Sequence, residues 1–531
     1  MSTEFVARVP VIAVLLLSVA FAVEVRADRL KVCTFSFHGP EEVAVFESRL
    51  PPTDFEFLDL SPPSALGATR AGMAPGTAPG VVGDDSGWLQ GVCRSVRCDI
   101  AVFSAEFAGK FFGRYGRSLS LQEMEEASCQ TRCNGLFHAP REVFLLACNT
   151  LATKDQDLRG PAVYLQVLLD HGFDQVSAER VVAMRYGPLG PTFREALRRI
   201  FMGVPRVYGF SSVAPTGEYT GPMLERYFNS VGDYRTHLER VRHDGPPNRA
   251  LAAAFAGTSM VETPGLLPYE PAAADRALIC ALYDERQPVA RRLEIVNDLM
   301  DRSDILAFVP SVQAFVDRHP YEEMRGEERP LFEEIQGNDA ARERILALVH
   351  QLDVSALQLE LGHFAVHMGW MTREQFRALV IDAARNLLRR PPMSDVVDVM
   401  CEVPKHEFVG DQFGSADLRD ALFRDAEGIR FISCLAPQGD AVSMRLAAAL
   451  DAEDPELRVW VAHALTRRLP LPDPVLLMVM AHVHDPVPDV AERLSWIFLG
   501  QRPLASDVRR ALEVRAPELA AKLPPPEPLP R

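Results

Sequence analysis

The sequence lacks the features of several large classes of protein. It has no basic patch interleaved with aromatic residues, and its formal net charge is −16, so phosphate backbones would be repelled and nucleic-acid binding is excluded. Beyond its first residues, no apolar run reaches the roughly 20 residues that a membrane-spanning helix needs. Nine cysteines among 531 residues are too few for a disulfide scaffold. With 47% apolar residues, the chain has the composition of a globular protein of more than one domain.

The first 27 residues have the order of a secretory signal. Arg8 is followed by an almost uninterrupted apolar run over residues 9–23 and then by the Val-Arg-Ala motif at 25–27. We expect cleavage near Ala27. Retention as a membrane anchor is the alternative, although the run is short for a span. The sequence therefore predicts an exported protein, periplasmic or extracellular, without a stable membrane span after cleavage.

Four cysteines lie close together in the first third of the chain. They are Cys93, Cys98, Cys129 and Cys133. Zinc binding is one explanation of such spacing, but no histidine completes a familiar ligand set. In an exported protein we expect one or two disulfides of undetermined pairing, with no metal and no other cofactor. The odd total leaves at least one cysteine outside any bridge, and Cys148 is the candidate.

Strand and helix signals alternate through the first half of the chain. Strands are predicted at residues 30–37, 55–60, 99–104, 143–148 and 205–212. Helical spacing of apolar residues predicts helices at 119–129, 162–171 and 192–202. This alternation predicts an α/β fold with a mostly parallel sheet covered on both faces. Residues 61–87, rich in Pro, Gly and Ala, are expected to form a flexible insertion.

The second half carries helical signals. We expect a helical connector over residues 246–335, helical repeats over 336–522 and an extended, disordered, proline-rich tail over 523–531.

An echo within the helical half indicates internal repetition. Asp454-Pro455 opens an apolar-periodic helix, and Asp485-Pro486 precedes a similar pattern. Residues 416–423 and 440–450 look like degraded copies. The pattern resembles HEAT-type repeats, which stack into solenoids.

Two short blocks in the first half carry the candidate chemistry. The apolar strand over residues 143–148 delivers Cys148 at its carboxyl end, and the preceding predicted strand runs into Ser104-Ala105-Glu106. These blocks resemble caspase-like cysteine peptidases, including the CHAT domains, in which the corresponding strand ends in a serine, a small residue and the catalytic histidine. The resemblance implies a caspase-like α/β module over residues 28–245.

Glu106 stands where the resemblance implies a histidine. A thiol is only slightly ionised near neutral pH, and the histidine both assists deprotonation and later protonates the leaving amine. A carboxylate performs the second task poorly, and its charge disfavours a nearby thiolate. Substitute histidines are His38, after the first strand, and His138, before the nucleophile strand. A purely structural alternative makes Cys148 a buried core residue and Glu106 a helix-capping or surface carboxylate.

A second histidine pair lies in the helical half. His363 and His367 are four residues apart on a predicted helix, a spacing that can ligate a metal. No third ligand lies nearby in the sequence, and Phe364, Val366 and Trp370 indicate packing. We therefore expect ordinary helix histidines there.

Three functions remain open. The lead hypothesis is an exported caspase/CHAT-like module without its catalytic base, a pseudopeptidase that binds a protein or peptide partner or acts as a scaffold. The alternative is an active cysteine endopeptidase in which Cys148 works with His38 or another histidine. The third is an envelope scaffold without a groove. The oligomeric state is left open.

Overall fold

The computed structural model describes most of the chain between residues 29 and 523. The described residues are 29–37, 41–62, 86–107, 109–113, 117–152, 161–170, 178, 182, 193–302, 305, 308–351, 355–389, 397, 400–401, 412–435, 437, 439–501 and 504–523. The predicted signal, His38, most of the predicted insertion and nearly all of the predicted tail lie outside these residues.

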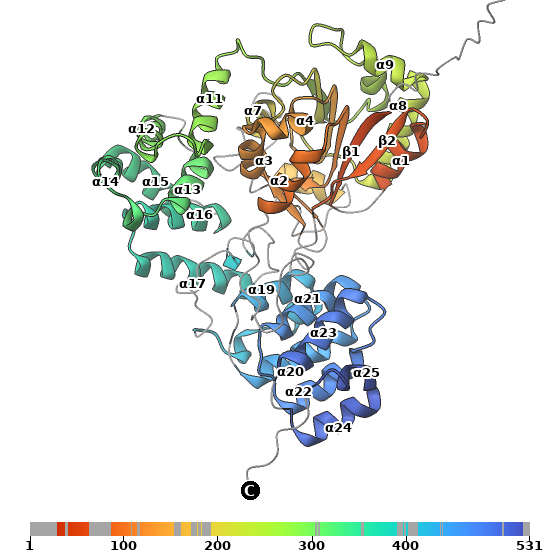
Figure 1. The fold of residues 1–531 in the computed structure, drawn as a ribbon, viewed down its shortest axis with the longest axis vertical. Coiled ribbons are helices and arrows are strands. Elements are labelled where there is room, and N and C mark those ends of the chain that lie inside the picture. The colour runs from red at the N-terminus through yellow and green to blue at the C-terminus, as the bar shows by residue number, and fades with distance from the viewer. Residues whose placement is uncertain are drawn as a thin grey trace, which may run out of the picture.

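A six-stranded, mostly parallel sheet forms the centre of the first half (Figure 1). Its strands are β1 (Leu30–Ser36), β2 (Phe55–Asp59), β3 (Ile100–Ser104), β7 (Glu142–Leu146), β8 (Arg206–Phe210) and β9 (Met260–Thr263). In space the order is β2-β1-β3-β7-β8-β9, and only the β8–β9 pair is antiparallel. A small antiparallel sheet contains β4 (Glu106–Phe107), β5 (Lys110–Phe112) and β6 (Ser118–Ser120).

Helices cover both faces of the main sheet, as the alternation of strands and helices predicts. On one face α1 (Glu41–Arg49), α5 (Pro161–Asp170), α8 (Gly217–Val231), α9 (Tyr234–Arg240) and α10 (Arg249–Ala254) contribute to one core. On the other, α2 (Ser86–Ser95), α3 (Leu121–Ser128), α4 (Asn134–Phe137) and α7 (Phe193–Ile200) contribute to a second. Phe144 and Leu146 of β7 enter the first core, whereas Val143 and Leu145 enter the second. Because successive strand residues point to opposite faces, an unbroken apolar strand fills both cores.

Three local predictions need correction. The strand predicted over residues 143–148 ends at Leu146, so Cys148 lies in the following turn. The helix predicted over 119–129 begins at Leu121, because residues 118–120 pair with β5 and Ser120 caps the helix in a capping box with Glu123. The region after residue 245 is not wholly helical, since β9 completes the sheet. Its four residues are too few to show a clear alternation of apolar and polar positions.

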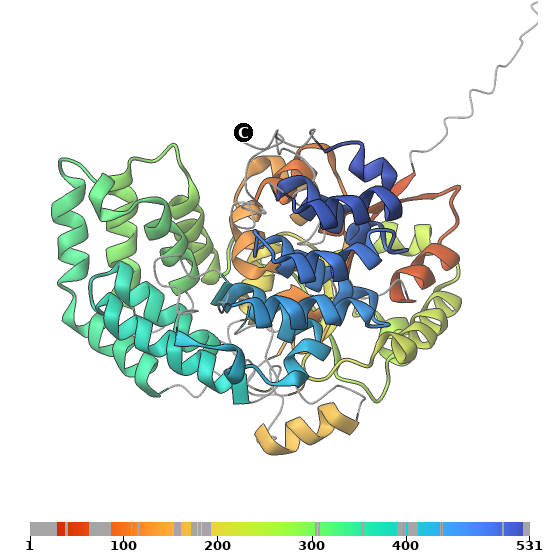
Figure 2. The same cartoon turned by 90° about the horizontal axis from the view of Figure 1, so that it is seen from below.

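The second half of the chain is largely helical and forms two groups (Figures 1 and 2). The first contains α11 (Ala272–Tyr283), α12 (Val289–Met300), α13 (Val309–Arg318), α14 (Glu328–Gln336), α15 (Asp339–Gln351), α16 (Ser355–His367) and α17 (Arg373–Arg389). The second contains α19 (Ala426–Leu435), α20 (Asp440–Ala448), α21 (Pro455–Thr466), α22 (Asp473–Val479), α23 (Pro488–Gly500), α24 (Ser506–Arg515) and α25 (Pro517–Ala520). Short 3₁₀ helices are η3 (Thr131–Cys133), η6 (Tyr321–Glu323), η9 (Ser415–Asp417), η10 (Asp420–Arg424), η11 (Ala449–Asp451) and η12 (Met480–His482).

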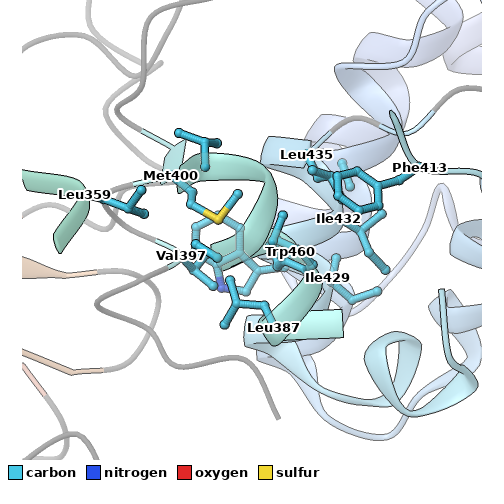
Figure 3. Packing of buried hydrophobic residues seen from close by; sticks show 14 of the residues in the cluster. Leu359, Leu387, Val397, Met400, Phe413, Ile429, Ile432, Leu435 and Trp460 are labelled. Carbon is cyan, nitrogen blue, oxygen red and sulfur yellow. The ribbon is translucent and has the colours of Figure 1, made fainter. Parts of the chain in front are cut away.

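One hydrophobic core connects the two helical groups. It runs from Ile279 of α11 to Leu523. At the junction, Val397 and Met400 pack together with Ile429 and Trp460 of the second group (Figure 3). The residues of the predicted connector from Ile279 onward therefore share a single core with those of the predicted repeats. The first part of the predicted connector belongs to the sheet region, through α10 and β9.

The second helical group repeats every 33 residues. The helices α20, α22 and α24 begin at Asp440, Asp473 and Ser506, and α21 and α23 begin at Pro455 and Pro488. Buried positions follow the same spacing. Examples are Val442, Val475 and Val508, and Leu446, Val479 and Leu512. Because α19, α21 and α23 contact one another in order, as do α20, α22 and α24, the helix pairs stack in two layers.

This spacing corrects the position of the internal repeat that the sequence indicates. Asp454 caps α21, whose first residue is Pro455, but α23 begins at Pro488 and not at Pro486. Pro455 and Pro488 each occupy the first position of their helix, where a backbone N–H would have no partner within the helix. Residues 416–423 are no degraded helical copy, because they form the 3₁₀ helices η9 and η10 over most of their length.

Four disulfides are present among the described residues. They join Cys33 to Cys98, Cys93 to Cys133, Cys129 to Cys280 and Cys401 to Cys434. All four clustered cysteines are thus bridged, but only Cys93 and Cys133 pair with each other. These bridges are consistent with an oxidising location outside the cytoplasm. In the described part of the chain, no helix has the length and apolar character required to cross a membrane.

Candidate functional site

The turn after β7 holds Cys148 at the carboxyl edge of the sheet. Asn149 has a φ of 59°, a left-handed conformation that asparagine tolerates, and its N–H donates to Ser212 O at 2.8 Å. Thr150 Oγ accepts from Phe210 N–H at 3.2 Å. Gly209 permits this approach, because a Cβ there would lie 2.5 Å from Thr150 Oγ. The turn is therefore packed against the end of β8.

Cys148 itself is a buried thiol. Its side chain is 3% exposed and belongs to the same core as α1 and α8. Its Sγ accepts a hydrogen bond from Ala214 N–H at 3.2 Å. Next to it, Asn149 Oδ1 accepts from Tyr164 OH of α5 at 2.9 Å. The bond from Ala214 holds the thiol against the segment that joins β8 to α8, and Tyr164 holds the adjacent Asn149.

Glu106 lies on β4, directly after the chain leaves the main sheet at Ala105. It pairs with Phe112 of β5, and its side chain is half-buried. Glu106 therefore caps no helix, because the segment after β3 forms a second sheet. The residue that the resemblance places at the histidine position stands at the start of that sheet.

The carboxyl ends of β1, β3 and β7 meet at this edge. Ser104 is the register partner of both Ser36 and Leu146. Phe37, the last residue described before His38, donates its N–H to Ser104 O at 2.9 Å. Phe37, which follows β1, therefore lies beside the end of β3.

A buried acid, Glu42, completes this edge from the side of α1. Ser104 Oγ donates to Glu42 Oε2, and Thr220 of α8 is a further hydrogen-bond partner. Burial raises the pKa of Glu42 to about 7, and the Ser104 hydrogen bond only partly offsets this effect. Glu42 thus titrates near neutral pH, as groups at functional sites often do.

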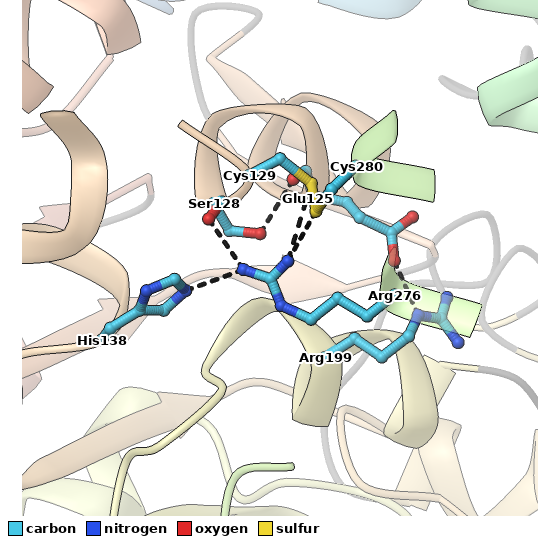
Figure 4. Close-up of a disulfide and its surroundings, with 7 residues drawn as sticks. All are labelled: Glu125, Ser128, Cys129, His138, Arg199, Arg276 and Cys280. Atoms are coloured by element: carbon cyan, nitrogen blue, oxygen red, sulfur yellow. Dashed lines mark hydrogen bonds and ion pairs between the residues drawn. A yellow bond between two sulfur atoms is a disulfide. The ribbon is translucent and has the colours of Figure 1, made fainter. Parts of the chain in front are cut away.

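His138 lies away from this edge. It follows α4 and accepts a hydrogen bond from Arg276 Nη2 of α11 at 2.9 Å (Figure 4). Burial, and secondarily the guanidinium charge, lowers the pKa of His138 to about 4, so the imidazole stays neutral. The same guanidinium donates to Ser128 O at 2.8 Å beside the Cys129–Cys280 disulfide. His138 therefore belongs to the junction between α3 and α11.

A second buried carboxylate, Glu142, opens β7 at the opposite end from Cys148. It accepts from Tyr208 OH at 2.6 Å and from Tyr234 OH, and lies 3.2 Å from His237 Nε2. Burial is the main cause that raises the pKa of both tyrosines well above the ordinary value. Cys148 lies six positions after Glu142, or roughly 20 Å along an extended chain. This network ties α9 to the sheet and takes no part in the edge described above.

The histidine pair of the helical half gains a neighbour that the sequence did not indicate. Asp317 of α13 lies 2.5 Å from His367, measured from Oδ1 to Nδ1. His363 and His367 sit one turn apart on α16, with ring centroids separated by 4.3 Å. A third potential ligand thus comes from a different helix.

Comparisons with known proteins return no match among family models, curated proteins or solved structures. The structure itself shows an α/β region with a mostly parallel six-stranded sheet, followed by a largely helical region.

Sequence reasoning found part of the edge and missed the rest. It placed Cys148 at the carboxyl end of the correct strand, two residues beyond where β7 ends, and Ser104 at the end of the neighbouring one. It missed Glu42, for which the only signal was an acidic pair, Glu41-Glu42, at the start of a helix. Such pairs usually stabilise a helix N-terminus at the surface, and only packing beneath α8 buries the second carboxyl group.

Proposed function

We propose that the protein is an exported caspase-like module that has lost its cysteine–histidine chemistry and binds a protein or peptide partner. The observation that carries this proposal is the burial of Cys148, because a nucleophile must reach its substrate. Glu106 at the histidine position supports the same conclusion. The order of the two blocks also supports a caspase-like fold, since β3 and β7 are parallel neighbours.

The helical half supports binding as the function. Stacked helix pairs present extended surfaces to protein partners. Met444 of α20 and Leu477 of α22 are exposed apolar residues, and both are the fifth residue of their helix. The repeat of 33 residues is shorter than the roughly 40–47 of HEAT repeats. We therefore keep the HEAT resemblance for the stacked architecture and not for the repeat length.

Cysteine labelling tests the chemistry directly. The other eight cysteines are in disulfides, so a mild alkylating reagent applied without reductant reports on Cys148. We expect labelling near neutral pH to be at least about tenfold slower than in the same chain unfolded with its disulfides intact. Glu106→His is expected to accelerate labelling, and Glu106→Gln, which removes the charge without adding a base, is its matched control.

Rapid labelling of the intact protein would overturn the proposal. If that labelling were lost in His38→Ala, Cys148 would be an activated nucleophile.

An active cysteine endopeptidase is the second candidate. The position of β1 favours it, because β1 is an interior strand and Phe37 is hydrogen-bonded to the end of β3. In this case Cys148 would attack the peptide carbonyl and His38 would protonate the leaving amine. Cleavage of an unfolded protein substrate that disappears in both Cys148→Ser and His38→Ala would establish it. Cleavage retained in Cys148→Ser would exclude it.

A further inference from the structure

Three neighbouring side chains, two on α16 and one on α13, have the donor set of a transition-metal site. We propose that Asp317, His363 and His367 bind a single divalent ion of the zinc class. One ligand atom from each residue can be chosen so that all three lie within 4.8 Å of one another. This site is separate from the edge around Cys148, so it holds or fails independently of the proposed function.

Helix geometry places the two imidazoles correctly. Residues four apart lie one above the other on a helix face, and the two rings here are 4.3 Å apart between centroids. This is the spacing through which a single helix offers two nitrogen ligands to one ion. The third ligand comes from α13, a helix in contact with α16.

The chemistry of the donors selects the kind of ion. Two imidazole nitrogens and one carboxylate oxygen suit Zn²⁺ and its neighbours, whereas Mg²⁺ and Ca²⁺ prefer oxygen ligands throughout. Zinc bonds of about 2.0–2.1 Å in a tetrahedron place ligand atoms roughly 3.3 Å apart. The 2.5 Å contact between Asp317 and His367 would open slightly around an ion, and side-chain rotation would adjust the other separations, which are at most 4.8 Å.

The surroundings allow an ion to enter and help to hold Asp317. The side chains of His367 and Asp317 are 32% and 41% exposed, so solvent reaches the site and water can supply the fourth ligand. Gln313, one turn before Asp317, donates from Nε2 to the Asp317 carboxylate, and the same Nε2 lies 3.3 Å from His367 Nδ1. A bound ion would replace the second of these contacts and leave the first to orient the carboxylate. It would thereby join α13 to α16.

Titration of the metal-free full chain, without a histidine tag, with Zn²⁺ tests the site. We expect saturable binding of one equivalent, measured by calorimetry and unaffected by excess Mg²⁺. His363→Ala, His367→Ala and Asp317→Asn should each weaken binding at least about tenfold. His482→Ala is the matched control, since His482 also contacts a carboxylate, 3.3 Å from Asp451, but has no second histidine four residues away. The affinity of the His482→Ala variant for Zn²⁺ should equal that of the unsubstituted chain.

Two further measurements keep the result decisive. Co²⁺ added to the unsubstituted chain should give the visible absorption of tetrahedral cobalt, which needs no variant to fold. Cys148→Ser should retain the site, which separates it from thiol binding. Absence of saturable binding, or binding unchanged in the His363→Ala, His367→Ala and Asp317→Asn variants, would overturn the proposal.

Discussion

At the scale of single residues, Glu42 shows how packing changes ordinary chemistry. A glutamate in the first turn of a helix normally faces solvent and stays ionised. Glu41, the first residue of the same helix, is exposed in this way. Glu42 instead points between β3 and α8, where it meets Ser104 and Thr220. Removal from water disfavours its charge, so the group becomes protonated near neutral pH.

This buried acid makes stability depend on pH. Burial raises the pKa of Glu42 from 4.5 to about 7, so both folded and unfolded chains bind its proton below pH 4.5. Between pH 4.5 and 7 the unfolded state releases that proton first, and stability is therefore lost as pH rises. The full loss is about 3 kcal/mol. Glu42→Gln, a neutral replacement, should gain most of this amount relative to the native chain at pH 8 and little at pH 4.5.

Denaturant unfolding of both chains at the two pH values measures this difference. Glu47→Gln, which replaces an exposed carboxylate on α1, is the matched control and should change the free energy of unfolding by no more than about 0.5 kcal/mol at either pH. A stability difference between Glu42→Gln and the native chain that stays constant from pH 4.5 to 8 would show that Glu42 does not titrate in this range.

At the scale of elements, the repeated helices of the second half carry both buried and exposed apolar residues. Within α22, Leu476 is buried in the core, whereas the adjacent Leu477 is 44% exposed. Neighbouring leucines therefore serve different purposes on one helix. The buried one joins the layers, and the exposed one belongs to the surface that we assign to partner binding.

Truncation of the two leucines should separate these purposes. Leu476→Ala leaves a cavity in a packed interior and should lower the free energy of unfolding by about 2–5 kcal/mol. Leu477→Ala should change it by no more than about 0.5 kcal/mol. Thermal or denaturant unfolding followed by circular dichroism gives both values. Equal losses in the two variants would contradict the stacked arrangement of α20, α22 and α24.

At the scale of the whole molecule, covalent and polar contacts join the sheet region to the helices. The Cys129–Cys280 disulfide links the end of α3 to α11 across 151 residues (Figure 4). Arg276 reinforces it through Ser128 O and the neutral His138, and Arg318 of α13 pairs with Glu126 of α3. The Glu125–Arg199 ion pair, 2.7 Å long and buried, holds α3 to α7 on the sheet side.

Removal of the long-range disulfide should uncouple the two regions. The Cys129→Ser/Cys280→Ser variant is expected to lose about 2–5 kcal/mol, because the closed loop restricts the unfolded chain. Scanning calorimetry should show the melting of the sheet region and of the helical region further apart than in the native chain. Cys401→Ser/Cys434→Ser, which removes a bridge within the helical half, is the control and should shift only the helical transition. An unchanged melting profile in the first variant would show that the polar contacts suffice.

Much of the architecture could be predicted from the sequence, because local patterns encode it. Apolar β-branched runs identified β1, β2, β3, β7 and β8 to within two residues of either end. Helical periodicity located α3, α5 and α7 in the same way. Patterns of this kind reflect burial against neighbouring layers, which adjacent residues share. The sequence did not predict the short strand β9, because its pairing with β8, and not its own residue pattern, makes it a strand.

The sequence by itself determined the alternation of strands and helices, the apolar strand that precedes Cys148 and the helical character of the second half. Only the tertiary structure decided which cysteines pair, how Glu42 becomes a buried acid and which carboxylate meets His363 and His367. Cys129 and Cys280 are 151 residues apart, and Asp317 lies on a different helix from the histidines. Contacts of this kind depend on how whole elements pack, so no local pattern of residues contains them.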